Sequence, residues 1–566
     1  MCTCLIAGRR ASRSGYALLA ANDDWDDTPA LLTHVPRQKH APDAVYTLVG
    51  GHTIPEIGET CGYLYTACKY EIGTLDRAWA GGTNDRNVSV AGTGVMAFKA
   101  IPWEGMVLEP DDIPLLILRR AETARGAVEL IGELVARYGL RPSGLDSCQS
   151  GATFSIADPS EGWVLEITPG GRWVAVRVPD DEVSVRANAF GTHDADLTDT
   201  ANVLASDGLA DYARAQGWWD GDERHFDFAC AYGADKSPNE WGPELDSMNM
   251  RRRWRAMELL SGRPQDENET LYSVRPAEPI TRRTFMDVLS DVYDGTKYDL
   301  TKLPTGDPFA DVTPDYALCR RGTLSSIVAD YTPETGSVLW TAIATPRRSF
   351  YMPLYVDIDG LPAFCETFLP GEGENTSLFW EFKELCILTQ RRFARHMEIT
   401  GKAKREWEAH AAAVLAAQTG HQADAIQLQA AARVLGEVPV TGAVEGFLSP
   451  GSHPLGQVAQ AHALEHGIGK QGGAAGLKVV ALHAGVIHHL PEHAGLLVLE
   501  LVHVLNGLLE HGHDAAVLVV QLLVHALQHV HHGHHEPAHG AQPEVGAAAG
   551  DGVGPVHLAA LVVAVV

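Results

Sequence analysis

The second residue of the chain is a cysteine, and its position suggests a particular chemistry. Cells usually remove an initiator methionine that precedes a residue as small as cysteine, so we expect Cys2 to become the mature amino terminus. One residue would then carry both a thiol nucleophile and a free α-amine. An α-amine titrates near about pH 8, well below a lysine, and can take the proton from a nucleophile on the same residue. The alternative is that Cys2 is an ordinary second residue.

The residues after Cys2 predict the element that positions it. Two apolar runs, 5–8 and 16–21, flank a polar turn and are typical of a β-hairpin. The second run ends in Asn22-Asp23-Asp24-Trp25, which places carboxylates at the end of the hairpin. If the strands pair, Asp24 returns close to the amine of Cys2 and can orient it, as a third group orients the base in a nucleophile–base pair. The alternative is that this polar cluster only solvates a loop.

Further segments carry a resemblance to a known family. They follow the opening Met-Cys-Thr in this order: Asn22–Asp24, Gly82–Gly92, Phe154–Asp158, Gly162–Glu166, Arg186–Asn188, Tyr293–Asp299, Val338–Trp340 and Tyr351–Tyr355. Together they resemble the N-terminal nucleophile (Ntn) hydrolases, and specifically the cysteine dipeptidases of the dipeptidase A type, which are relatives of the bile salt hydrolases and penicillin V acylases. The resemblance covers residues 2–430.

The resemblance implies a fold, an activity and three further site residues. The implied fold is α+β, the Ntn four-layer αββα sandwich, and the implied reaction is hydrolysis of dipeptides without metal or organic cofactor. Asn84 matches the family's oxyanion asparagine, Asn188 would line the pocket, and Arg252 matches the active-site arginine. An amidase or acylase that acts on a non-peptide amide remains an alternative, as does an inactive scaffold, because a shared fold does not decide the reaction.

Two of these residues also have ordinary explanations. Asn84 lies in a turn signal, and its amide can either donate to an oxyanion or simply form the turn. Arg252 belongs to the cluster 251–255, where an arginine can hold a substrate carboxylate in two hydrogen bonds. The alternative for the cluster is a solvated helix face with one arginine in an internal ion pair. By its spacing Arg252 matches best, although a neighbouring arginine would fit nearly as well.

The chain departs from the family at one position. The relatives commonly have an arginine three residues before the aspartate that Asp24 matches, and this chain has Ala21. That arginine belongs to the charge environment of the nucleophile, so its absence bears on how the thiol is activated. Arg86 or an arginine of the 251–255 cluster is the candidate to replace it.

Hydrophobic periodicity predicts the remaining elements. Apolar positions recur at steps of three and four over 115–138, which predicts a helix that ends at Gly139 and packs on a sheet. Further helical patterns cover 281–294 and 379–434. Strands are predicted at 45–49, 64–66, 88–97, 153–157, 163–168, 173–178, 183–189, 324–329 and 338–344. Strands on both sides of a helix favour a layered α+β domain.

Composition excludes some classes of partner. A net charge of −28 argues against a nucleic acid, since phosphate binding needs a basic face. No uncharged apolar run reaches the roughly 18 residues of a membrane span. The nine cysteines are scattered, none forms a Cys-x-x-Cys, and no signal peptide precedes Cys2, so we expect a cytoplasmic protein. The expected partner is a small peptide, and a homo-oligomer stays open.

Composition also divides the chain. We expect an Ntn-hydrolase catalytic domain over 1–375, a helical C-terminal elaboration over 376–437 and a low-complexity tail over 438–566. Residues 421–566 hold 19 of the 26 histidines, one aromatic residue and three Lys or Arg. The tail is interpreted as a metal-binding appendage around His531–His535, as an interaction tail or, preferably, as translation in the wrong frame without selected function.

Overall fold

The computed structural model of the chain describes residues 2–418 apart from several short segments. The segments left out are 26–27, 69–76, 96–98, 144–150, 234–241, 270, 305, 311–316, 334, 359, 362–364, 367–376 and 390–392. The predicted tail over 438–566, with its histidine cluster, and the end of the helical stretch predicted to reach 434 therefore lie outside the described residues. The division of the chain at 375 and 437 stays a prediction.

Two antiparallel sheets form the centre of the described part. The seven-stranded sheet has the order β16-β14-β1-β2-β17-β18-β19, and the eight-stranded sheet has the order β15-β13-β12-β11-β10-β9-β8-β3. The strands of the first sheet are β1 (Thr3–Ala7), β2 (Leu18–Asp24), β14 (Val183–Ala187), β16 (Ser273–Val274), β17 (Thr323–Thr332), β18 (Gly336–Ile343) and β19 (Met352–Tyr355). Those of the second are β3 (Ala30–Val35), β8 (Tyr63–Cys68), β9 (Arg77–Asn84), β10 (Ser89–Val95), β11 (Gly151–Ala157), β12 (Gly162–Thr168), β13 (Arg172–Arg177) and β15 (Val203–Ala205).

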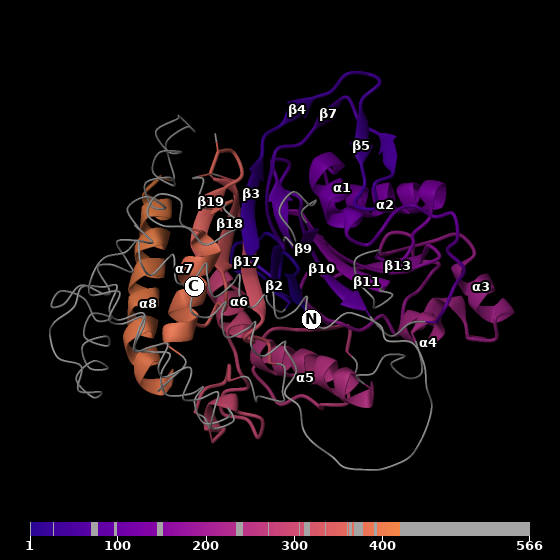
Figure 1. Cartoon of the computed structure of the whole chain (residues 1–566). Helices are drawn as coiled ribbons and strands as arrows, with labels where there is room; N and C mark the ends of the chain where they lie inside the picture. Colours follow the sequence, from indigo (N-terminus) through magenta and orange to yellow (C-terminus); the bar gives the residue numbers. More distant parts are fainter. Residues whose placement is uncertain are drawn as a thin grey trace, which may run out of the picture. The chain divides into compact units, whose positions relative to one another are not determined.

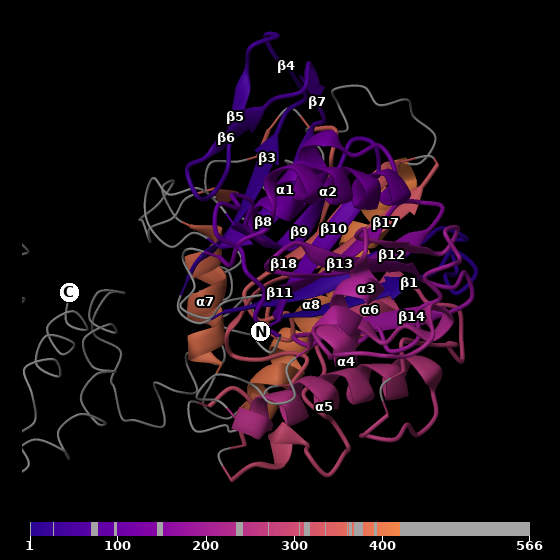
Figure 2. The ribbon, with the colours of Figure 1, turned by 90° about the vertical axis from the view of Figure 1, so that its right-hand side faces the viewer.

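Helices cover the outer face of each sheet. The helices are α1 (Asp112–Arg120), α2 (Ala124–Tyr138), α3 (Leu209–Ala215), α4 (Phe228–Tyr232), α5 (Gly242–Ser261), α6 (Arg282–Leu289), α7 (Leu378–Leu388) and α8 (Phe393–Gln418), with 3₁₀ turns η1 (Glu223–His225) and η2 (Leu300–Lys302). Helices α1 and α2 pack on strands of the eight-stranded sheet, whereas α5, α6 and α8 pack on the seven-stranded sheet. Figure 1 shows the two sheets between these helices, and Figure 2 shows α1 and α2 in front of the eight-stranded sheet. The predicted α+β four-layer αββα sandwich is confirmed.

Side-chain alternation along the strands separates the core between the two sheets from the cores beneath the helices. Ile6 and Leu19 face the second sheet and pack with Ala91 and Val164 of that sheet. The next residues along the strands point to the opposite face, where Leu5 and others contact the helices. A third cluster fills the space between the eight-stranded sheet and α1 and α2. Two small hairpins, β4 (Gln38–Lys39) with β7 (Glu59–Thr60) and β5 (Val45–Thr47) with β6 (Thr53–Pro55), lie apart from the large sheets.

The predicted hairpin at the amino terminus is confirmed. Strand β1 pairs antiparallel with β2 in the register Thr3 to Asn22, so the residue opposite Cys2 is Asp23. Strand β1 also pairs with β14, which precedes Asn188. The nucleophile candidate therefore begins a central strand with a neighbour on each side.

The single helix predicted over 115–138 is wrong, because the structure has two helices there. Helix α1 ends at Arg120, and the backbone of the following Ala121 is extended. Thr123 caps the start of α2 by accepting a hydrogen bond from Gly126 N. A threonine cap of this kind stabilises a helix start, and the apolar periodicity alone did not reveal it. The predicted stop is confirmed, since Gly139 ends α2 with a φ of 66°.

Within the described ranges, no helix has both the length and the apolar character that crossing a membrane requires.

Candidate active site

The thiol of Cys2 lies at the start of β1 and contacts a carboxylate. Only 6% of the residue is exposed, and its Sγ donates a hydrogen bond to Asp23 Oδ1 at 3.4 Å. The pKa of the Cys2 thiol is raised to about 12, chiefly by burial, and the charges of Asp23 and Asp24 contribute to the rise. The positive amino terminus and the backbone N–H of Asp24 oppose these effects. In the chain that still carries Met1, Cys2 is therefore a neutral thiol at physiological pH, and a nearby base must remove its proton.

Asp24, the carboxylate predicted to orient the amine, is fully buried at the end of β2. Its Oδ1 accepts a hydrogen bond of 2.5 Å from Thr323 Oγ1 on the neighbouring strand. Burial raises the pKa of Asp24, while Arg320, the amino terminus, Thr323 and Arg252 lower it. The role of Asp24 toward the amine of Cys2 stays a prediction.

Arg252 fixes the backbone of the nucleophile. It lies on α5 and is fully buried, and its Nη1 donates to the carbonyl oxygen of Cys2 at 2.8 Å and to Thr3 Oγ1 at 3.0 Å. Its Nη2 donates to Asn188 Oδ1 at 2.8 Å and to Asn249 Oδ1 at 2.6 Å. Burial lowers the pKa of the Arg252 guanidinium, and the charge of Asp24 opposes this. The structure therefore brings the predicted Arg252 and Asn188 together beside Cys2.

Asn188 connects this cluster to the second sheet. One amide N–H of Asn188 donates to the carbonyl oxygen of Gly94 at 2.8 Å, and Asn249 Nδ2 donates to the carbonyl oxygen of Asn188 at 3.0 Å. Asn249 and Arg252 are three residues apart on α5, so they share one face of the helix. A single helix face thus holds both the nucleophile and the asparagine.

Buried charges support the turn that follows Asn188. Glu166 accepts hydrogen bonds from Gly191 N at 2.7 Å and Thr192 N at 3.1 Å, and its carboxylate lies 3.7 Å from Arg186 Nε. A Cβ on Gly191 would lie 3.2 Å from the guanidinium of Arg253, so glycine permits this close packing. Burial lowers the pKa of Arg253 to about 9, and the nearby positive charge of Arg186 contributes.

The predicted oxyanion role of Asn84 is not supported by its contacts. Asn84 Nδ2 donates to the carbonyl oxygens of Leu118 at 3.1 Å and Ala121 at 2.9 Å, while its Oδ1 accepts from Arg86 N and Val88 N. Both amide hydrogens are used, so the side chain ties the turn between β9 and β10 to the end of α1. These contacts are those of the structural explanation considered for this asparagine, and its oxyanion role stays a prediction.

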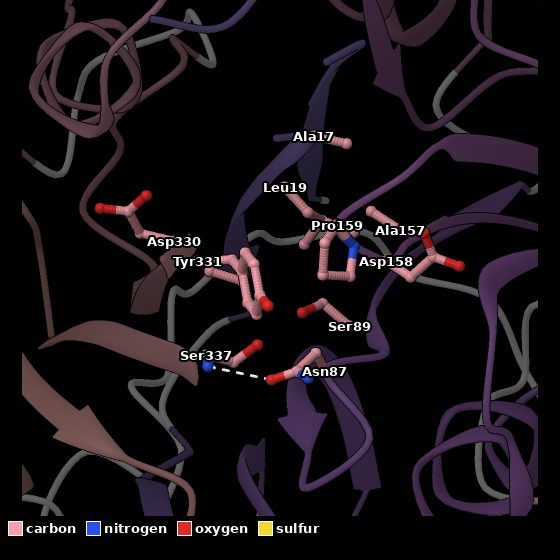
Figure 3. A pocket seen from close by; sticks show the side chains of 11 residues that line it. Ala17, Leu19, Asn87, Ser89, Ala157, Asp158, Pro159, Asp330, Tyr331 and Ser337 are labelled. Carbon is pink, nitrogen blue, oxygen red and sulfur yellow. Dashed lines mark hydrogen bonds between the residues drawn. The ribbon is translucent and has the colours of Figure 1, made fainter. Parts of the chain in front are cut away.

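The turn that follows Asn84 borders a pocket at the start of β2, at the other end of that strand from Asp23. Its Asn87 accepts a hydrogen bond from Ser337 N and borders a pocket that Ala17 and Leu19 also line (Figure 3). Leu19 is four residues from Asp23 along β2, which corresponds to about 13 Å in a strand. The turn is therefore far from the thiol.

The position of the missing arginine is apolar in this chain. Ala21 is fully buried between the sheets and lies opposite Cys4 and Ile327. Arg86, one suggested replacement, lies in the distant turn with its guanidinium 3.9 Å from Glu122. The positive charges that act on Asp24 instead come from Arg252 and from Arg320.

The other arginines of the 251–255 cluster have structural contacts. Arg251 lies over the ring of Tyr298, and Arg253 Nη2 donates to the carbonyl oxygen of Leu271. Arg255 forms the internal ion pair that was expected for one of them, with Asp291 at 2.8 Å. Within the cluster, Arg252 is thus the residue that contacts the nucleophile.

Sequence reasoning missed Asp23, Asn249 and Thr323. The signal for Asp23 was available, because a hairpin that pairs residue 3 with residue 22 must place residue 23 opposite Cys2. Asn249 lies one helical turn before Arg252 and could have been found from that spacing. Thr323 had no sequence signal, because it donates its hydrogen bond to Asp24 from a strand 299 residues later in the chain.

The arrangement suits acyl transfer by a thiol. It combines the sulfur nucleophile of Cys2 with a backbone carbonyl held by Arg252, and the buried opposite charges of Arg252 and Asp24 lie close by. In the described part of the chain, no group of three or more histidine, cysteine or acidic side chains is placed to hold a metal ion.

Comparison with known proteins places the chain among peptidases. The model of peptidase family C69 matches residues 1–406. A probable dipeptidase from Latilactobacillus sakei is 24% identical over 447 residues, which cover 75% of this chain and 89% of the relative. A probable dipeptidase from Salmonella dublin is 26% identical over 378 residues, covering 62% and 80%. Among solved structures, a mutant conjugated bile acid hydrolase from Clostridium perfringens matches with a TM-score of 0.33 and 11% identity, covering 67% of this chain and 95% of that structure.

Proposed function

The chain belongs to peptidase family C69, and we propose that it is a cysteine-type dipeptidase of the Ntn class that uses Cys2 as its nucleophile. The match over residues 1–406, the dipeptidase relatives and the four-layer sandwich support this function. The observation that carries it is the position of Cys2 at the start of a central strand, with its sulfur on Asp23 and its carbonyl on Arg252.

The proposed reaction begins with removal of Met1, which frees the α-amine of Cys2. That amine accepts the thiol proton, and the sulfur attacks the carbonyl carbon of the peptide bond. We assign Asp24 to hold the resulting ammonium, because this buried carboxylate ends β2, the strand that pairs with the strand following Cys2. The carbonyl oxygen gains negative charge in this step and needs hydrogen-bond donors. We assign one donor to Asn188. One N–H of its amide donates to the carbonyl oxygen of Gly94, and we assign the other N–H to the oxyanion.

The second half of the reaction returns the proton. The ammonium of Cys2 protonates the leaving amine as the carbon–nitrogen bond breaks, and the acyl group remains on sulfur as a thioester. Water then attacks the thioester while the amine takes its proton, and the thiol is restored. Arg252 acts as a positioning residue throughout, since it holds the carbonyl of Cys2 and the side chain of Asn188 in one geometry.

We also infer a reducing compartment such as the cytoplasm. The mechanism requires a reduced thiol at Cys2, and the seven cysteines of the described residues are free.

Variants of the two amino-terminal cysteines test the proposed function. Cys2→Ala should abolish hydrolysis of dipeptides and leave the melting temperature unchanged, while Cys2→Ser should retain a trace of activity because a hydroxyl is a much weaker nucleophile. Cys4 is the matched control, since it lies on the same face of β1, is buried and has no part in the reaction. Loss of activity in Cys4→Ala but not in Cys2→Ala would refute the assignment.

A further inference from the structure

We propose that Glu166 is a positioning residue for the reaction, and that it acts by fixing the loop that carries Asn188. This inference rests on the proposed function, in which Asn188 donates a hydrogen bond to the oxyanion. It adds a residue of the eight-stranded sheet to a site whose other members belong to or adjoin the seven-stranded sheet and α5.

Glu166 lies on β12 and points into the space between the two sheets. Val164, two residues earlier on this strand, belongs to the core between the sheets, so alternation places Glu166 on the same face. The side chain is fully buried. A buried carboxylate needs hydrogen bonds or an opposite charge, so the partners of Glu166 show which part of the chain depends on it.

The partners of Glu166 lie on both sides of Asn188 in the chain. After Asn188, the backbone N–H groups of Gly191 and Thr192 donate to the two carboxylate oxygens of Glu166, at 2.7 and 3.1 Å. Before Asn188, Nε of Arg186 lies 3.7 Å from Oε1 of the same carboxylate. One side chain from the opposite sheet thus holds the chain before Asn188 and the chain after it.

The position of the backbone at Asn188 decides where its free amide N–H lies. The other N–H donates to the carbonyl oxygen of Gly94 at 2.8 Å, and Oδ1 accepts from Arg252 Nη2 at 2.8 Å. These contacts orient the amide, but its distance from the thiol depends on the loop that carries it. A displacement of about 1 Å in a positioned group can cost about 100-fold in rate. Glu166 is the residue that keeps this loop in place.

Glu166 also lies beside two buried cations. Burial lowers the pKa of Arg253, the positive charge of Arg186 contributes, and the negative charge of Glu166 opposes both effects. Arg253 packs closely on the loop, since a Cβ on Gly191 would lie 3.2 Å from its guanidinium. Without the charge of Glu166, the two arginines would repel each other next to the loop.

A double-mutant cycle between Glu166→Gln and Asn188→Ala tests the inference, with kcat and KM measured for alanyl-alanine. Glutamine keeps the size of the side chain, removes its charge and replaces one of the two acceptor oxygens by a donor. We expect Glu166→Gln to lower kcat by about 10- to 100-fold and to change KM by less than about twofold, because the oxyanion contact is made in the transition state. In the Asn188→Ala background, the same substitution should lower kcat by less than about threefold, since no donor is left to position.

Asp158→Asn is the matched control. Asp158 is also a buried carboxylate of the eight-stranded sheet that accepts backbone hydrogen bonds, from Ala124 N at 2.8 Å and Ser160 N at 2.7 Å. It borders the pocket at the start of β2, away from the thiol (Figure 3). Its replacement should lower the melting temperature and leave kcat and KM unchanged.

The cycle separates positioning from support of the fold. An equal loss of kcat in both backgrounds would mean that Glu166 does not act through Asn188, and would overturn the inference. A change confined to KM, or no change at all in Glu166→Gln, would also overturn it. All three results leave the proposed function intact, whereas a wild-type enzyme that does not cleave the dipeptide would refute both.

A second variant keeps the test decisive if Glu166→Gln does not fold, as judged by its circular dichroism. Glu166→Asp retains the charge beside Arg186 and shortens the reach to the backbone of Gly191 and Thr192. It takes the place of the glutamine variant in the same cycle. The same pattern is expected, with a loss of kcat in the wild-type background that disappears in Asn188→Ala, and an equal loss in both backgrounds would overturn the inference.

Discussion

At the scale of single residues, strand geometry decides which polar side chain serves the reaction. Asp23 and Asp24 are chemically alike, and only the alternation of side chains along β2 separates the one at the thiol from the one at Thr323. The two asparagines differ in a similar way. Asn84 uses its whole amide to join a turn to a helix, whereas Asn188 touches the cluster around Cys2.

Alanine variants of these two asparagines should therefore have different effects. Asn84→Ala removes hydrogen bonds to two buried carbonyls, so we expect the free energy of unfolding to fall by about 2 to 4 kcal/mol while kcat at low temperature is unchanged. Asn188→Ala should lower kcat/KM by about 100- to 1000-fold, since it removes an oxyanion donor. Urea denaturation and steady-state kinetics on both variants measure the two effects. A large loss of kcat in Asn84→Ala without loss of stability would restore the role that its contacts argue against.

The sequence predicted which residues lie near the nucleophile more reliably than it predicted the contacts that each residue makes. Cys2, Asn188 and Arg252 come together as expected from the family pattern. The contacts of Asn84 could not be predicted, because its partners, the carbonyls of Leu118 and Ala121, belong to a helix end that the sequence pattern did not show. A side chain's hydrogen-bond partners depend on tertiary structure, which residue type and spacing do not contain.

At the scale of elements, helix α8 connects to the strands of the site through buried charges. Lys404 Nζ donates to Ser349 O at 2.8 Å and to Glu408 Oε1 at 2.6 Å, and Glu408 also accepts from Tyr351 N. The hydroxyl of Tyr351 lies 2.6 Å from that of Ser326, which pairs with Asn22 of β2. The helix is therefore held against the sheet that carries the nucleophile.

Removing the buried lysine should loosen this helix. Lys404→Met removes one of the two positive partners of the buried Glu408 and leaves Arg283 as the other, and breaking a buried pair in this way costs up to about 3 to 5 kcal/mol. Lys402→Met on the same helix is the control, because Lys402 and Glu406 are 70% and 67% exposed and such a pair contributes less than about 1 kcal/mol. Thermal and urea unfolding of both variants make the comparison. Equal stability of the two would show that α8 does not depend on the buried pair.

Elements with a local signal were predictable, and boundaries set by caps were not. The apolar runs on either side of a polar turn predicted the hairpin of β1 and β2 correctly. The break between α1 and α2 depends on the Thr123 cap and on the extended backbone of Ala121. The apolar periodicity of the sequence continues across this break, so it did not reveal the boundary. The side-by-side order of β2 and β17 joins segments about 300 residues apart, and no local pattern could predict it.

At the scale of the whole molecule, buried thiols make stability depend on pH. Burial raises the pKa of Cys2, Cys319 and Cys365 to about 12 each, against about 9 for an exposed thiol. Between these values the unfolded chain has lost the thiol protons and the folded chain has kept them. The unfolded state then binds fewer protons, so the free energy of unfolding falls as pH rises. The contribution is fully present below about pH 9 and is lost toward pH 12.

Urea unfolding at a series of pH values from 8 to about 10.5 checks this dependence. Replacing Cys319 or Cys365 by alanine should flatten the decline, by up to about 1.4 kcal/mol per pH unit for each thiol removed. Cys230 is exposed, so Cys230→Ala is the matched control and should leave the slope unchanged. The same slope in all of these variants would mean that other groups cause the decline.

The central claim is that the amine and the thiol of Cys2 act as one catalytic unit, and the most direct measurement is activity before and after that amine is exposed. A chain carrying an amino-terminal extension that a specific protease removes immediately before Cys2 should be inactive on dipeptides, because the base is tied up in a peptide bond. Cleavage should produce full activity in step with the appearance, by intact mass, of a chain that begins at Cys2. Full activity of the uncleaved chain would contradict the account.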